Sequence, residues 1–417
     1  MTTTHPGHGS SQALRIPEIR FFIITNGLFR LASRATVVVI GLQIYKLTAS
    51  ALALGILGLV EAIPAISLSL YGGYIADRLD RRKILLITKA VSTLCVLLLA
   101  ILSLKHHQTS ILGLYTVIFV AGIARGFADP ASTAFEAQVV PKQLTVNAAS
   151  WISSTGLGCA VIGPVIAGFA YETLGIVVTY VIISLFFAGS WISMAKIPSK
   201  HLPSLPKKEP LIQSMTAGLR FVFQEQVLIG AMALDLFAVF FGGAVALFPI
   251  FATDILNVGA RGLGLMEAAP ALGALTVMLI STRHPPIHYA GRNLLVCVAG
   301  FGISMIIFAF SRNFILTLIT LFASGIFDGV SMVIRRSIVR LLSPDAIRGR
   351  VASVSWIFVG ASNELGAFES GLLAHWIGVL PTVWVGGAIT LLVVAITAIS
   401  APQLRRLSFD PHKLERL

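Results

Sequence analysis

The chain has 417 residues, of which 56% are apolar and only 12% charged, and it carries a net charge of +13 and a mean hydropathy of +0.88. A soluble domain typically has about 25% charged residues, so this composition leaves too little polar surface for a water-soluble globule and excludes that class. A helix that spans a bilayer needs roughly 20 mostly apolar residues. The length suffices for about twelve such spans with short loops, and the sequence therefore predicts an all-α membrane protein.

Apolar segments of spanning length follow one another along the chain. We predict transmembrane helices at residues 20–45, 50–75, 84–104, 111–131, 148–170, 175–196, 226–250, 263–282, 293–311, 314–338, 352–373 and 380–400. After the sixth, residues 198–210 contain four prolines and several charges and predict an extended linker. Residues 211–225 are amphipathic and predict an interfacial helix.

These segments divide the chain into two groups of six predicted helices. The predicted domains are a tail at 1–19, a six-helix bundle at 20–197, the linker with its interfacial helix at 198–225, a second six-helix bundle at 226–400 and a tail at 401–417.

The basic residues are distributed unevenly between the two sides of the predicted membrane. If the N-terminus is cytoplasmic, the outward loops hold only Lys46, Lys105, Arg261 and Arg312. Apart from Arg30, Arg34 and Arg125, which lie at membrane depth, the other Lys and Arg of the 31 lie on or next to the inner side. This asymmetry predicts cytoplasmic termini in a multi-pass protein of the inner membrane. The positive charge therefore reflects topology, with membrane lipids rather than nucleic acid as the predicted partner.

Charges inside the predicted spans recur with a period of three helices. They are Arg30 and Arg34 in span 1, Glu61 in span 2, Arg125 and Asp129 in span 4, Asp235 in span 7, Glu267 in span 8, Asp328 in span 10 and Glu364 in span 11. A charge at membrane depth must face a cavity or a partner, so the first helix of each triplet is predicted to line a central cavity. Repeats around a midplane site are typical of secondary transporters.

The loop between spans 2 and 3 carries the sharpest motif, Gly72-Gly73-Tyr-Ile-Ala-Asp77-Arg78-Leu-Asp80-Arg81-Arg82-Lys83. It resembles the G-x-x-x-D-R-x-G-R-R loop of the major facilitator superfamily, with Asp80 in place of the usual glycine. In that superfamily the loop latches the cytoplasmic face shut.

The resemblance implies a gating latch made of Gly73, Asp77, Arg78, Arg81, Arg82 and Asp129. Gly73 is expected to permit close helix approach. We expect Arg81 to reach Asp129, and Asp77 to face the positive start of span 11 near residues 349–353. A plain cluster of inner basic residues is the simpler interpretation, but it does not account for the glycine and the aspartate.

The fourth span carries Arg125 in the sequence Ala121-Gly-Ile-Ala-Arg125-Gly-Phe-Ala-Asp129-Pro130. This is similar to the superfamily's span-4 arginine motif, in which the arginine is tied to proton movement. A guanidinium cannot be deprotonated, so Arg125 would hold a nearby carboxylate ionised until a proton or the substrate competes. A structural ion pair with Asp129, one turn away, is the alternative.

The fifth span carries Gly156, Gly158, Gly163-Pro164 and Gly168 and resembles the antiporter motif of exporters, except that Ala167-Gly168 stands where the superfamily has Gly-Gly. Small residues let helix backbones touch, and Gly163 with Pro164 predicts a kink. Packing alone is the alternative, because glycines are common in membrane helices.

Shorter segments extend the resemblance over about residues 20–400. They are Gln43-x-Tyr45-x-Leu-Thr48, Leu247-Phe-Pro249 and Pro344-Asp-Ala-Ile-Arg348-Gly349-Arg350-Val351. Together with the D-R-x-D-R-R loop, they look like the enterobactin-exporter and macrolide-efflux branch of the superfamily.

Charged residues at membrane depth are the candidates for substrate binding and coupling. They are Arg30, Arg34, Glu61, Arg125, Asp235, Asp328 and Glu364. Arg30 and Arg34 are four apart and share one helix face, and arginine suits carboxylate, phosphate or catecholate oxygens. We expect Asp235 and Asp328 either to pair with these arginines or, like Glu61, to carry a proton. The alternative is that the arginines only link the two halves.

The resemblance implies alternating access by two six-helix bundles of the major facilitator fold. No G-x-x-x-x-G-K-S/T loop is present in the sequence, so we expect a proton gradient to supply the energy, with no cofactor. The predicted function is proton-coupled export of a small amphiphilic or anionic solute of drug or siderophore type, without an obligate protein partner.

Two other functions stay open. A lysophospholipid flippase would keep the fold and change the cargo. A membrane-embedded enzyme lacks support, because no His/Asp, Ser/His or metal-binding constellation falls at one depth in the sequence.

Overall fold

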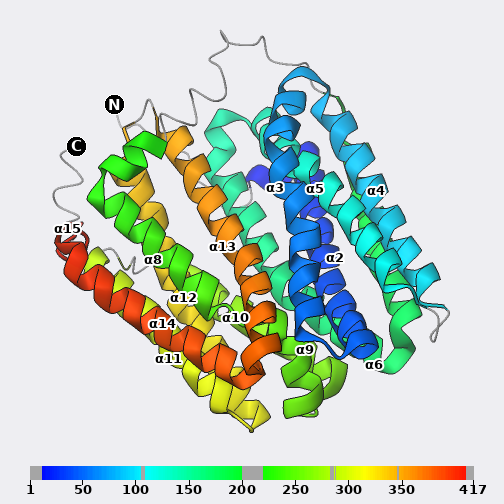
Figure 1. The fold of residues 1–417 in the computed structure, drawn as a ribbon. Helices are drawn as coiled ribbons and strands as arrows, with labels where there is room; N and C mark the ends of the chain where they lie inside the picture. The colour runs from blue at the N-terminus through cyan, green and yellow to red at the C-terminus, as the bar shows by residue number, and fades with distance from the viewer. Residues whose placement is uncertain are drawn as a thin grey trace, which may run out of the picture. The chain divides into compact units, whose positions relative to one another are not determined.

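The computed structural model describes residues 12–104, 109–199, 219–281, 286, 288–344 and 347–409 (Figure 1). Over these residues the secondary structure is helical and contains no strand, which confirms the all-α class. In this described part of the chain, ten helical segments are long and apolar enough to cross a membrane. Most of the predicted linker, residues 200–218, lies outside the described residues, and residues 219–224 are helical.

The spanning helices begin close to the predicted boundaries, but the fourth continues to Val139 instead of ending at 131, and the seventh stops at Gly242 instead of 250. In chain order the helices are α1 (Gln12–Arg15), α2 (Pro17–Thr48), α3 (Ala51–Arg78), α4 (Arg81–Leu102), α5 (Ile111–Val139), η1 (Lys142–Leu144), α6 (Thr145–Ala195), α8 (Gln226–Gly242), η2 (Val245–Leu247), α9 (Phe248–Ile250), η3 (Phe251–Ile255), α10 (Gly259–Ser281), α11 (Ala290–Phe310), α12 (Phe314–Leu342), α13 (Arg348–Ile377), α14 (Val379–Ser400) and α15 (Pro402–Arg405).

Polar residues cap the starts of several spanning helices. Asp80, Ser110 and Asn313 precede α4, α5 and α12, and the side chain of each accepts a hydrogen bond from a backbone N–H of the first turn. A cap of this kind satisfies a donor that has no partner inside the helix. Asp80, the residue that departs from the superfamily's loop pattern, is thus the N-cap of α4.

Two predicted spans run together in α6. Its 51 residues would measure more than twice the roughly 30 Å thickness of a bilayer core at about 1.5 Å per residue. The one residue with non-helical dihedral angles is Gly175, whose φ is +79°. Glycine tolerates this conformation because it has no Cβ. The break therefore lies at Gly175, and the backbone at the predicted kink, Gly163-Pro164, keeps helical dihedral angles.

The predicted seventh span is interrupted where a continuous helix was expected. Helix α8 ends at Gly242, and the chain continues through a 3₁₀ turn, the short α9 and the π-helical turn η3. Pro249 lies in this second part and lacks the N–H that a continuous helix needs. Helix α13, with 30 residues, is long enough to span but is not among the ten apolar segments.

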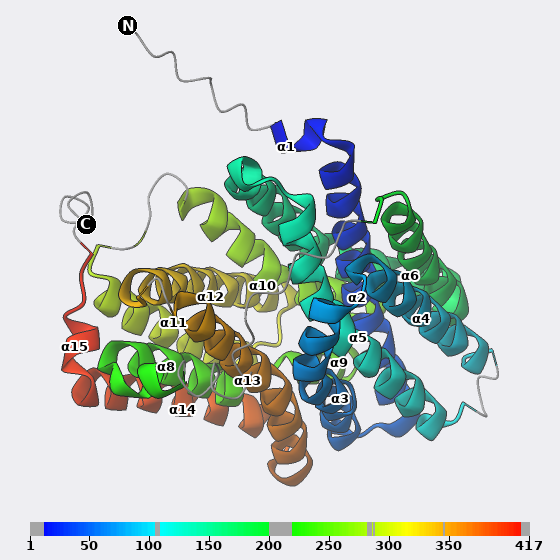
Figure 2. The ribbon, with the colours of Figure 1, turned by 90° about the horizontal axis from the view of Figure 1, so that it is seen from above.

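Contacts divide the chain into two compact units: unit 1 is residues 1–39 and 63–205, and unit 2 is residues 40–62 and 206–417. The end of α2 and the start of α3 therefore belong to unit 2, which was not predicted from the sequence. In unit 1, α4 packs on both α5 and α6 (Figure 2). In unit 2, α8 packs on α13 and α14, and α11 on α12 and α14 (Figure 2).

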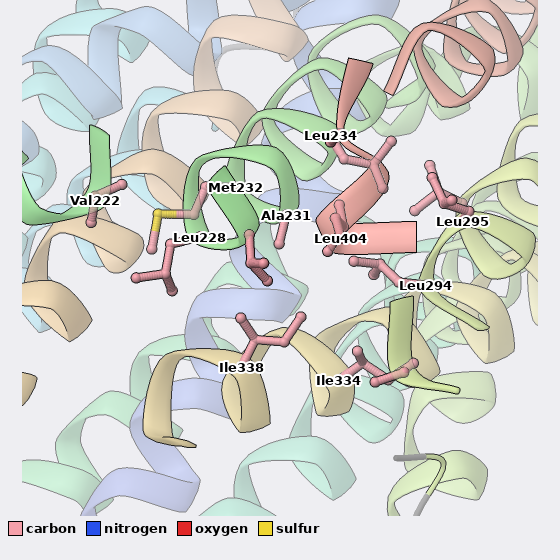
Figure 3. Packing of buried hydrophobic residues seen from close by; sticks show 14 of the residues in the cluster. Val222, Leu228, Ala231, Met232, Leu234, Leu294, Leu295, Ile334, Ile338 and Leu404 are labelled. Atoms are coloured by element: carbon pink, nitrogen blue, oxygen red, sulfur yellow. The ribbon is translucent and has the colours of Figure 1, made fainter. Parts of the chain in front are cut away.

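Each unit has its own apolar core. In unit 2, Leu228 and Met232 of α8 pack with Ile334 and Ile338 of α12, and Leu404 of α15 joins them (Figure 3). In unit 1, Phe22 of α2 and Phe135 of α5 are buried with their ring centroids 5.8 Å apart. Close packing of this kind fixes the positions of the few charged residues that the units enclose.

Candidate functional site

Three charged side chains of unit 2 form one ion-paired group. Arg335 of α12 is paired with Asp235 of α8, and its second terminal nitrogen lies 3.6 Å from a carboxylate oxygen of Asp328. The Asp235 side chain is 7% exposed and that of Arg335 13%, whereas that of Asp328 is 43% exposed. We call Asp235, Arg335 and Asp328 the acidic triad. One end of the triad is buried and the other is open.

Helix geometry explains why α12 supplies two members of the triad. Asp328 and Arg335 are seven residues apart, about two turns, and share a face. Side chains of a helix lean toward its N-terminus, so Arg335 reaches back toward Asp328. Asp235 faces α12 because α8 packs on α12 through their apolar side chains.

The buried end of the triad lies in apolar surroundings. Asp235 and Arg335 line a small pocket together with Leu228, Met232, Phe358 and other side chains of α8, α12 and α13. With both aspartates ionised, the triad has two negative charges and one positive, and the neighbouring Arg336 of α12 also interacts electrostatically with Asp328. A charge stranded in such a site is costly, and removal of one partner from a buried pair typically destabilises by about 3–5 kcal/mol.

Arg335 was not among the residues predicted from the sequence, where Arg30 or Arg34 were the expected partners of Asp235 and Asp328. The structure pairs both aspartates with Arg335. Because Arg335 lies near the end of its span, it had been grouped with the basic residues of the inner side. The seven-residue spacing from Asp328 was the signal in the sequence that could have found it.

In unit 1, Arg30 and Arg34 are both exposed residues on one face of α2. Two glycines of α6 allow it to pack closely against this face. If alanine replaced Gly156, its Cβ would lie 3.2 Å from the Arg30 Cδ, and at Gly163 the added Cβ would lie 2.7 Å from the Leu31 carbonyl oxygen. Gly163 thus lets α6 approach α2 closely. Arg30 interacts electrostatically with Glu136 of α5, which was not a candidate from the sequence.

A second charged group of unit 1 surrounds Asp129. Arg125 lies 3.6 Å from Asp129, one turn away on α5, and both side chains are about half exposed. Lys89 of α4 is 3% exposed, its amino group lies 4.1 Å from the ring centroid of Phe29, and it interacts electrostatically with Asp129. Lys89 was expected only near the inner end of a predicted span, and its burial and its interaction with Asp129 were not predicted from the sequence.

In the loop motif, a glycine packs α3 on α5 and the aspartate lies beside α4. The close approach is made by Gly72 rather than Gly73, because a Cβ on Gly72 would collide with the Gly126 carbonyl oxygen, whereas one on Gly73 would lie 3.9 Å from Pro130. Asp77, which is 60% exposed, lies 3.5 Å from Arg81.

The basic part of the motif binds backbone carbonyls of unit 1. Arg81 donates to the carbonyls of Ala76 and Ala134, at 2.9 and 3.0 Å, rather than pairing with Asp129 as expected. Arg82 donates to the carbonyl of Ala195 at 2.7 Å. These bonds fasten the start of α4 to the ends of α3, α5 and α6.

Arg78, the remaining residue of the proposed latch, contacts an aromatic ring. The Arg78 guanidinium lies 4.0 Å from the ring centroid of Tyr74, an attractive cation–π geometry. The expected partner of Asp77, at residues 349–353, lies largely outside the described side chains.

The remaining acidic candidates lie in unit 2. A Cβ on Gly58 of α3 would lie 3.9 Å from a carboxylate oxygen of Glu364, and a Cβ on Gly55 would lie 3.1 Å from Gly371, so α3 and α13 approach closely here. Glu61, one turn further along α3, is half-buried. Tyr45 donates a hydrogen bond to Asp254 of η3. Within the described residues, no group of three or more His, Cys, Asp or Glu is arranged to hold a metal ion.

Comparisons with known proteins give a family, similar exporters and a similar fold. A family model described as transmembrane secretion effector matches residues 11–413. The multidrug efflux pump Tap of Mycolicibacterium fortuitum is 26% identical over 373 residues, 86% of this chain and 89% of that protein. The enterobactin exporter EntS of Shigella flexneri is 24% identical over 348 residues, 82% of each chain. The solved D-xylose–proton symporter superposes with a TM-score of 0.71 at 16% identity, over 94% of this chain and 99% of that one.

Proposed function

This chain belongs to the transmembrane secretion effector family of the major facilitator superfamily, a family of transporters rather than enzymes, and on that premise we propose that it is a proton-coupled exporter. Its cargo would be a small amphiphilic or anionic solute of drug or siderophore type. The proposed topology has twelve spans and cytoplasmic termini, because most Lys and Arg lie on one side. The proposed membrane is the bacterial inner membrane.

The acidic triad is the single observation that carries the proton coupling. Two carboxylates share one guanidinium, and one end of the group is buried while the other is open. Binding of a proton at the triad would change how strongly Arg335 holds Asp235 to α12. A change that favours one conformation over another is what couples an ion gradient to alternating access. Glu61 remains a further candidate carrier, and Arg34 and Arg125 remain candidate modulators.

The cargo class rests on the exposed arginines of α2. Arg30 and Arg34 present two guanidinium groups on one face, and guanidinium groups bind carboxylate, phosphate and catecholate oxygens well. The names of the similar proteins Tap and EntS point in the same direction, toward multidrug and enterobactin export.

Transport in proteoliposomes tests the proposal directly. Enterobactin and ethidium serve as anionic and cationic probes, with transport driven by an imposed pH gradient and compared with exchange in its absence. We expect Asp235→Asn and Asp328→Asn to retain exchange and lose gradient-driven transport. Arg340→Gln, which removes an exposed charge of α12, is the matched control. Full gradient-driven transport by both aspartate variants would exclude the triad from coupling.

The topology has its own test. Cysteine introduced at Gly259 should react with an impermeant reagent added outside intact cells, and cysteine at Ser204 only after permeabilisation. Labelling of position 204 from outside would contradict the cytoplasmic termini.

A further inference from the structure

A carboxyl group outside the triad lies beside the interruption in the seventh span. Glu369 and Ser370 are consecutive residues of α13, and α13 packs directly on α8 and η2. A Cβ on Gly366, one turn earlier, would lie 2.8 Å from the Phe240 carbonyl oxygen. Backbone contact this close places Ser370 against the end of α8.

Ser370 is buried, at 2% exposed, and has two possible acceptors for one proton. Its hydroxyl oxygen lies 3.2 Å from the carbonyl oxygen of Gly243 and 3.4 Å from a carboxylate oxygen of Glu369. A serine hydroxyl donates only one hydrogen bond. The two acceptors therefore compete for it.

The Gly243 carbonyl belongs to the point where α8 stops. The N–H of Gly243 still bonds to Val239, at 2.9 Å, but the dihedral angles of Gly243 leave the helix, and the next turn begins at Val245. Among the described residues, the hydrogen bond to this carbonyl comes from Ser370. Interrupted helices whose freed carbonyls face a site are a recurring feature of transporters.

Glu369 is half-buried and no described basic side chain pairs with it. The elements packed on α13 bring Asp235 from α8 and Asp328, Arg335, Arg336 and Arg340 from α12, none of which interacts with Glu369, while η2 and α14 bring no charge. The nearby part of α3 contributes Glu61. Helix α13 itself carries Arg348 and Arg350 in its first turn, Glu364, and His375 in its last turn, which does not interact with Glu369. A carboxylate at this depth without a cation is expensive to keep ionised.

We propose that Glu369 is a second proton-binding site and that the Ser370 hydroxyl transmits its state to the interruption in span 7. When Glu369 is ionised, its carboxylate accepts the hydrogen bond from the Ser370 hydroxyl, and the Gly243 carbonyl loses its donor. When Glu369 binds a proton, its own O–H donates to the Ser370 oxygen, and the Ser370 hydroxyl turns to Gly243. The inference rests on the proposed proton coupling and adds to it a site independent of the triad.

Carbodiimide labelling tests proton binding without measuring transport. Dicyclohexylcarbodiimide reacts with protonated carboxyl groups in apolar surroundings, and mass spectrometry of the full-length protein in detergent locates the adduct. We expect labelling of Glu369 to fall several-fold from acid to alkaline pH, and labelling of the exposed Glu225 to be absent throughout. Absence of labelling at Glu369, or labelling that does not change with pH, would overturn the site.

A cysteine reporter tests the transmission step. In a variant whose native cysteines are replaced by alanine, cysteine is placed at Val245, which is 47% exposed next to the interruption, or at Ile315, 68% exposed on α12, as the reference. The rate of thiol modification at position 245 is divided by the rate at position 315, because the intrinsic pH dependence of a thiol affects both rates alike and cancels in the ratio. We expect this ratio to change with pH and to become constant in both Glu369→Gln and Ser370→Ala. A constant ratio with Glu369 and Ser370 intact, or a persisting change in Ser370→Ala, would overturn the transmission, whatever the transport assay of the triad shows.

Discussion

The two units hold their charges in different ways. In unit 2, Arg335 joins α12 to α8 by bridging two aspartates, and Asp235 and Arg335 are almost fully enclosed. In unit 1, Arg125 pairs with Asp129 on its own helix, and Arg30, Arg34 and Arg125 remain exposed or half exposed. Unit 2 thus uses Arg335 to hold acids between helices, whereas unit 1 leaves Arg30 and Arg34 exposed on one face of α2.

This difference implies a division of labour. In the proposed mechanism, the acids of the triad respond to protons, because they already hold Arg335 inside unit 2. The exposed guanidinium groups of α2, which keep their charge at all pH values of interest, would respond to the cargo. Single substitutions can separate these roles, beginning with the change that should disturb the protein most.

Arg335→Gln should reduce the stability of the protein more than the loss of any exposed charge. It strands the buried Asp235, and breaking a buried pair costs about 3–5 kcal/mol. We expect a low yield of monodisperse protein and a lowered Tm in detergent. The double variant Arg335→Gln/Asp235→Asn should recover much of the loss, because no buried charge is then unpaired. Normal stability of the single variant would contradict the ion pairing.

Arg30→Gln and Arg34→Gln should leave the protein folded and lower its affinity for an anionic cargo. A hydrogen bond to a charged group contributes about 1.5–3 kcal/mol, which corresponds to roughly 10–100-fold in affinity. Enterobactin binding by the purified variants measures this, and Arg20→Gln, an exposed arginine of the same helix, is the control. Equal affinity in all three variants would remove α2 from cargo binding.

The sequence predicted the helices well and their charged partners poorly, for a physical reason. Apolar length alone defines a span, so α4, α12 and α14 begin and end within a few residues of their predicted limits. Arg335 was missed because a partner on another helix depends on how two helices are rotated against each other. Lys89 was missed because composition does not show which way a single side chain points.

The glycine motif illustrates the same limit. The break in α6 is at Gly175, where φ is positive and where the sixth span was predicted to begin, and the kink at Gly163-Pro164 stays a prediction. The tight contact of the loop motif is made by Gly72, one residue from the glycine that the resemblance indicated. Sequence spacing identified the helices that touch, but not the residue at which they do.

Gly163→Ala should destabilise unit 1, because its Cβ would lie 2.7 Å from the Leu31 carbonyl oxygen, closer than a backbone atom can accommodate. Overpacking of this kind typically costs about 1–3 kcal/mol. Gly158→Ala, on the same helix with open space around it, is the matched control and should have no effect or raise Tm slightly. Equal Tm values in the two variants would contradict the close approach of α6 to α2.

Asp77→Asn should have the smallest effect on stability and a clear effect on transport. Asp77 is 60% exposed and 3.5 Å from Arg81, which is itself held by two carbonyls, so the fold does not depend on it. If Asp77 serves the proposed gating latch, loss of its charge removes about 0.3–1 kcal/mol from the closed state, a roughly two- to fivefold change in its population. Gradient-driven transport should fall while folded yield holds.

Asp80→Asn removes the same charge three residues away and keeps the cap of α4, because asparagine caps as well as aspartate does. Transport that is reduced equally in both variants would show a general charge effect, and normal transport by Asp77→Asn would reduce the motif to a determinant of topology.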